Sequence, residues 1–146
     1  MSYSGITAES LAGAIEEFPS RMIVALYDEA IASLQGAKDA IAVGDIVARF
    51  RATERTAEVV AALYSGLDMV EGGRIAENLS VVYEIVLRNI AYINTRNDAR
   101  IAERAIELLM PLREAWAALD ERIAVEVAAA ESRESVGHAD LMRAAG

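Results

Sequence analysis

The side chains that could carry chemistry are few in this chain of 146 residues, and none is arranged as a catalytic site. The single histidine, His138, lies near the C-terminus. A serine nucleophile needs a neighbouring base, and the serines at positions 20, 33, 65 and 80 have no histidine near them in the sequence. The chain has no cysteine, which excludes thiol chemistry and disulfides. We predict no catalytic residue.

Metal and phosphate sites are not indicated either. A di-iron site in a helical bundle needs Glu-x-x-His pairs on facing helices, and the sequence has none. The pair Gly72-Gly73 lacks the lysine and the preceding strand of a phosphate-binding loop. The many carboxylates fall at polar helix positions, which is typical of solvated faces. The sequence therefore predicts no metal, no cofactor and no enzymatic activity.

Composition predicts one all-helical domain. The chain is rich in alanine, the best helix former, and has only two prolines. Its net charge of −9 argues against nucleic acid as a partner, because binding phosphates needs a basic face. No run reaches the ~18 uncharged apolar residues of a membrane span, so membrane insertion is not expected. The N-terminus has no basic segment followed by an apolar run, so a secretory signal is not expected.

Turn residues divide the chain into four long apolar patterns. Gly44-Asp45, Gly72-Gly73 and Asn97-Asp98 separate helices predicted at about 19–42, 46–70, 74–96 and from 99 onward. Both glycines of the middle turn are expected to reverse the chain through left-handed backbone conformations. We predict an all-α fold, an antiparallel up-down four-helix bundle with a short N-terminal lead helix. Its parts are a lead segment (1–18), the bundle (19–131) and a flexible tail (132–146).

The lead segment and the two prolines lead to further predictions. In the lead segment, Leu11, Ile15 and Phe18 share one face, which is consistent either with an amphipathic end packed on the bundle or with a movable cap over a groove. Pro19 suits the first position of the first long helix. Pro111 lies in the middle of the last helix, where it removes a backbone hydrogen bond, so we expect a kink near 107–110 or a break into two helices.

The second and third helices carry more apolar residues than one packing stripe needs. The predicted stripe of the second helix is Ile46, Phe50, Thr53, Ala57, Val60, Tyr64 and Leu67. Val59 and Leu63 form a second row beside it, and Val81 and Ile85 lie outside the stripe of the third helix. Such surplus apolar surface must meet the lead segment, another copy of the chain or a partner helix. We predict that these four residues line a partner-binding groove.

Three motifs occur in order along the chain. They are Pro-x-x-Met-Ile-x-x-Leu-Tyr-Asp at 19–28, Leu-Asp-x-x-x-Gly-Gly-x-Ile-Ala-x-Asn-Leu-x-x-x-Tyr at 67–83, and Leu-Leu-x-x-Leu-Arg-x-x-Trp at 108–116. Together they resemble the FliS family, the bacterial flagellin export chaperones. The resemblance implies binding of the C-terminal segment of flagellin in the cytoplasm, which prevents premature polymerisation before export. The flagellar export gate is a further candidate partner.

Residue types, positions and, for Tyr27 and Asp28, the resemblance indicate roles for motif residues. Tyr27 and Asp28 have a shared structural or partner-binding role, whereas Asn78 and Tyr83 are expected to support the turn formed by Gly72 and Gly73. Trp116 is expected to anchor the core. Two alternatives remain open, a phosphorelay-type signalling bundle and a purely structural homodimer. The first needs a histidine on a helix in the body of the bundle, where this chain has none. The oligomeric state is left open.

Overall fold

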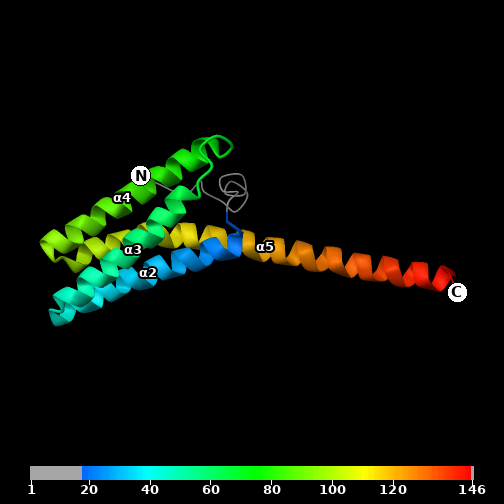
Figure 1. Ribbon diagram of the computed structural model, residues 1–146, viewed down its shortest axis with the longest axis horizontal. Coiled ribbons are helices and arrows are strands. Elements are labelled where there is room, and N and C mark those ends of the chain that lie inside the picture. Colours follow the sequence, from blue (N-terminus) through cyan, green and yellow to red (C-terminus); the bar gives the residue numbers. More distant parts are fainter. Residues whose placement is uncertain (1–17, 146) are drawn as a thin grey trace.

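Four helices joined by short turns form the described part of the chain, residues 18–145 of the computed structural model. They are α2 (Ser20–Val43), α3 (Ile46–Ser65), α4 (Gly73–Arg96) and α5 (Ala99–Ala145). Successive helices run in opposite directions (Figure 1). Helix α2 packs against α3 and α5, and α4 also packs against α3 and α5, so the four helices close a ring. This confirms the predicted all-α up-down bundle. The predicted lead helix falls in residues 1–17, outside the described residues.

The first and last turns form as their residues predict. Gly44 ends α2 with a φ of 72°, and its N–H donates to the carbonyls of Ala40 and Ile41. Asp45 then caps α3, because its carboxylate accepts a hydrogen bond of 3.0 Å from the Ala48 N–H. Asn97 ends α4 with a φ of 52°. Pro19 sits at the N-cap of α2, one place before the predicted first helical position.

The middle turn begins earlier than predicted, because α3 ends at Ser65 and not at Val70. The carboxylate of Asp68 accepts hydrogen bonds from the N–H groups of Val70 (3.1 Å) and Glu71 (2.8 Å). A short polar side chain that binds the backbone in this way competes with helical hydrogen bonding. Val70, predicted as the last apolar residue of the second helix, is 88 % exposed.

Glycines at this turn are needed for two different reasons. Gly66 directly follows α3, and a Cβ placed there would lie 2.6 Å from the ring of Phe18, so the close approach requires glycine. Gly73 has a φ of 52°, a conformation that side chains with a Cβ rarely adopt. Gly72 has a φ of −73°. The prediction that both adjacent glycines adopt left-handed conformations is therefore right only for Gly73.

Helix α5 is longer than predicted and passes through Pro111 without interruption. The expected break into two helices is wrong. The carbonyl of Glu107, four residues before the proline, loses its helical donor. Both residues are exposed, so water can supply the missing bond. Residues 132–145 are helical, where a flexible tail was predicted, and every side chain at 121–145 is exposed. In Figure 1 this end of α5 projects beyond the other helices. The division into three segments stays a prediction.

The core runs through the middle of the ring. Its largest fully buried side chains are Trp116, Tyr27, Tyr83, Ile23, Leu34, Leu63, Leu79, Ile93, Leu109, Leu112 and Val60. Helix α3 contributes two buried polar residues, Thr53 and Thr56. Their hydroxyls donate to the carbonyls of Phe50 and Ala52, both at 2.9 Å, so no polar group is left unpaired by their burial.

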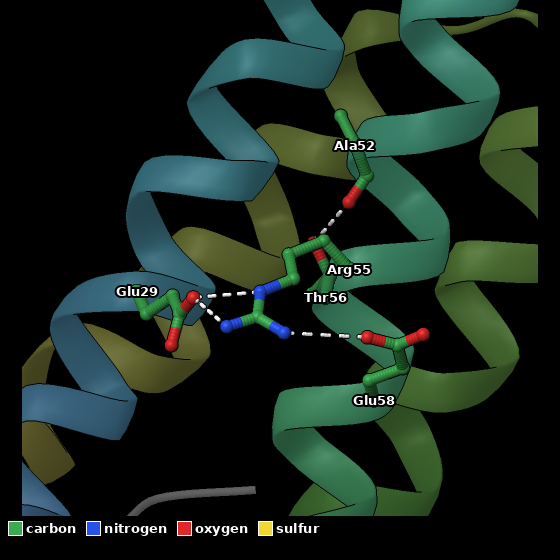
Figure 2. A network of polar contacts seen from close by, with 5 residues as sticks. All are labelled: Glu29, Ala52, Arg55, Thr56 and Glu58. Atoms are coloured by element: carbon green, nitrogen blue, oxygen red, sulfur yellow. Dashed lines mark hydrogen bonds and ion pairs between the residues drawn. The ribbon is translucent and has the colours of Figure 1, made fainter.

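Ion pairs on the surface of the bundle join α2 to α3. Arg55 of α3 donates to Glu29 of α2 through two guanidinium nitrogens and to Glu58 on its own helix at 3.3 Å (Figure 2). The same view shows the Thr56 hydroxyl bonded back to the carbonyl of Ala52, one turn earlier on α3. Exposed pairs of this kind orient neighbouring helices more than they stabilise them.

Candidate partner-binding surface

Residues from all three sequence motifs meet at one buried cluster. Tyr27 of α2 and Tyr83 of α4 are fully buried, their hydroxyl oxygens are 2.5 Å apart, and their ring centroids are 6.3 Å apart. Trp116 of α5 is buried beside them. Among the described residues its buried indole Nε1 has no hydrogen-bond partner, but the nearby indole opposes the rise in the pKa of Tyr27. The cluster joins three helices.

The chemistry of this cluster is structural. Burial raises the pKa of the Tyr27 phenol well above its usual value, and the neighbouring Tyr83 raises it further. Burial also raises the pKa of Tyr83, although the hydrogen bond from Tyr27 opposes that shift. Both phenols are therefore neutral near pH 7. The structure places Tyr27 out of reach of a partner, and of its two predicted roles it supports the structural one.

Asp28 lies on the surface next to this cluster and pairs with Arg113 of α5. The Arg113 guanidinium donates through Nε to one carboxylate oxygen at 2.7 Å and through Nη2 to the other at 3.4 Å. This contact joins the first motif to the third, as Tyr27 and Trp116 do in the core. The sequence could not predict this ion pair, because Asp28 and Arg113 are 85 positions apart along the chain. Asp28 is exposed and remains a predicted partner contact.

The four groove residues do not share one surface. Val59 and Leu63 are buried in the core, so their predicted place beside the stripe of α3 is wrong. Val81 is 36 % exposed and Ile85 is partly exposed. The misassignment arose on α3, where the buried Thr56 was left out of the predicted stripe. Residues predicted for the stripe are exposed instead, namely Ile46, Phe50 and Tyr64.

An apolar strip remains on the outside of α4. Val81, Ile85 and Tyr92 are spaced by four and seven residues, which places them on one helical face, and we call them the outer α4 face. Tyr64 of α3 is exposed beside α4 and donates to Glu84 at 3.2 Å. The guanidinium of Arg96 lies 4.5 Å from the centre of the Tyr92 ring. The exposed Arg88 lies on the same face between Ile85 and Tyr92, so the strip is apolar at Val81 and Ile85 and carries a charged group before Tyr92.

The remaining candidate residues carry no chemistry of their own. Asn78 is exposed on α4, and Asp68 supplies the side-chain hydrogen bonds of the turn, so the structural role of Asn78 stays a prediction. His138 lies on the exposed part of α5, outside the ring of packed helices. Within residues 18–145 no cluster of three or more His, Cys, Asp or Glu side chains could hold a metal ion. No helix in this part of the chain is long and apolar enough to cross a membrane.

An apolar strip on a helical bundle is a surface that an amphipathic partner helix can cover, as in helix-binding proteins. The family model described as "Flagellar protein FliS" matches residues 9–123 of this chain. The chain belongs to the FliS family, a family of chaperones and not of enzymes.

Three relatives illustrate the match. The "Flagellar secretion chaperone FliS" of Salmonella typhimurium is 34 % identical over 115 residues, which cover 78 % of this chain and 84 % of the relative. The protein of the same name from Vibrio cholerae is 29 % identical over 98 residues, which cover 67 % and 72 %. The "Flagellar secretion chaperone FliSB" of Pseudomonas aeruginosa is 26 % identical over 98 residues, which cover 67 % and 78 %.

Proposed function

We propose that this protein is a cytoplasmic export chaperone that binds the C-terminal segment of flagellin and prevents its polymerisation before secretion. Family membership supports the chaperone role, since the relatives are named flagellar secretion chaperones. The observation that carries the binding mode is the outer α4 face, an apolar strip on a helix whose opposite side is fully buried. An amphipathic client helix can bury its own apolar side against such a strip.

The client helix would lie along α4 over Val81 and Ile85, with Tyr64 and Tyr92 at its edges. Their apolar character matters because a disordered client must be ordered on binding, and burial of apolar anchors offsets that cost. Burying one aliphatic side chain completely contributes about 1.5–3 kcal/mol. The tyrosine hydroxyls and nearby charges can bind polar groups at the edge of the client helix.

Calorimetry with full-length protein and a peptide from the flagellin C-terminus tests this proposal, with an N-terminal flagellin peptide as the specificity control. Ile85→Asp and Val81→Asp should each weaken binding by about tenfold or more, because a charge would be buried without a partner. Met110→Asp is the matched control, since Met110 is exposed on α5. Folding of each variant is checked by circular dichroism.

Two results would overturn the proposal. In the first, the C-terminal peptide binds no better than the N-terminal one. In the second, folded Ile85→Asp and Val81→Asp proteins bind the C-terminal peptide as tightly as the Met110→Asp control, which would remove the outer α4 face as the binding surface.

A further inference from the structure

One end of the bundle carries exposed apolar side chains, and we call it the bundle tip. It is made by the α2–α3 turn and the α4–α5 turn, which Arg49 joins by donating through Nη1 to the Asn97 side chain at 2.6 Å. Four large apolar residues are exposed on the α2–α3 side, namely Val43 (79 %), Ile46 (65 %), Val47 (61 %) and Phe50 (56 %). An apolar cluster of this size on consecutive turns of chain indicates an interaction surface.

The bundle tip is also positively charged in an acidic protein. Residues 43–51 and residues 96–100 each carry two arginines and one aspartate, whereas the whole chain has a net charge of −9. The Nε of Arg49 is buried and has no hydrogen-bond acceptor in the part of the chain that the structure describes. A carboxylate brought to this end would give the guanidinium an acceptor if the side chain turned outward. The tip therefore fits a partner that is both apolar and acidic.

The other end of the molecule presents such a partner, the C-terminal extension of α5 at residues 121–145. It spans about 37 Å at the helical rise per residue, and every side chain on it is exposed. A helix without packing gains little stability, so one of this length is expected to be covered in its working state. It carries five acidic residues and three arginines. Steps of four, seven and seven residues place Ile123, Val127, Glu134 and Leu141 on one face.

We propose that the C-terminal extension of one copy packs across the bundle tip of a second copy. The apolar residues of the extension would cover Val47 and Phe50, and its carboxylates would lie near Arg49 and Arg51. The extension and the tip lie at opposite ends of the molecule, so one copy cannot make this contact with itself (Figure 1). The contact is head-to-tail, and each added copy leaves a free tip and a free extension. This inference is independent of the proposed client binding.

Sedimentation of the full chain over a range of concentrations tests the proposal. The wild type should gain mass with concentration, and less so at high salt, because the charges attract across the contact. Phe50→Asp should prevent binding at the bundle tip, and Leu141→Asp should prevent binding by the C-terminal extension. Each variant alone should therefore remain monomeric. Both positions are exposed, so folding is retained. The Met110→Asp control should associate as the wild type does.

An equimolar mixture of the two variants is the decisive measurement. The Phe50→Asp protein keeps its extension and the Leu141→Asp protein keeps its tip, so the mixture should form dimers and nothing larger. A wild type that stays monomeric at every concentration would overturn the proposal. So would a mixture that stays monomeric, because an intact extension and an intact tip would then be present without pairing. Association of Leu141→Asp alone would show a tip-to-tip contact, and association of Phe50→Asp alone would show an extension-to-extension contact, and either result would also overturn it.

Discussion

Removing the hydroxyl groups of the buried tyrosine pair tests how the three motifs hold the bundle together. Taking away one partner of a buried hydrogen bond costs about 1–3 kcal/mol, because the other partner stays buried and unpaired, whereas removing both can cost little. Tyr83→Phe should therefore lower the free energy of unfolding by about 1–2 kcal/mol. Tyr27→Phe should lower it more, because the Tyr27 hydroxyl faces both Tyr83 and Trp116. The double variant should lose at least about 1 kcal/mol less than the sum of the single variants.

Urea unfolding followed by circular dichroism measures these differences. Tyr64→Phe is the matched control, since its hydroxyl bonds Glu84 on the surface, and it should change stability by less than about 0.5 kcal/mol. Single variants no less stable than this control would show that the pair contributes nothing. Strict additivity of the two single variants would show that the hydroxyls do not interact.

Three further outcomes follow from the same structure. The contribution of the tyrosine pair to stability should be constant below about pH 10 and fall above it, because burial raises the pKa of Tyr27 and Tyr83 in the folded state and only the unfolded state ionises there. Urea midpoints at rising pH measure this fall, and the double phenylalanine variant should show a smaller one. Gly73→Ala should cost about 1–2 kcal/mol in urea unfolding because its φ is positive, whereas Gly72→Ala at the neighbouring position should cost much less, and equal costs would contradict the assignment. Pro111→Ala should raise the thermal midpoint, because it restores a helical hydrogen bond and removes the clash of the ring with the preceding turn, which together cost about 3 kcal/mol in a helix interior. An unchanged midpoint would mean that the proline does not destabilise α5.

Much of the fold was predictable because its signals are local. Gly44, Asp45 and Asn97 act through their own backbone and their nearest neighbours, so residue type alone indicates where helices end. The turn after α3 was harder to predict. There the carboxylate of Asp68 binds backbone N–H groups within a stretch whose apolar residues continue the helical pattern. The close contact of Gly66 with Phe18 was also not predictable, since it depends on where another segment lies.

The candidate site was predicted less well, for a reason visible on α3. The predicted stripe included Thr53 but left out Thr56, whose hydroxyl bonds its own helix and which is buried as well. The packed face is therefore rotated from the predicted stripe. Val59 and Leu63 turn into the core, while Ile46 and Phe50 turn out at the bundle tip. On α4 the hydroxyl residue Ser80 is also buried, but Val81 and Ile85 keep some exposure as the sequence indicated.

The sequence by itself determined the helical class, and within the described residues 18–145 it determined the four helices and most of their ends, because these depend on interactions within a few residues. The sequence also shows the order of the three motifs along the chain, but it does not show that they lie in contact in the folded protein. Only the tertiary structure brought Tyr27, Tyr83 and Trp116 into one core cluster and paired Asp28 with Arg113. Those contacts join residues that are far apart along the chain. They arise from the way helix faces rotate and pack against one another, which no local pattern specifies.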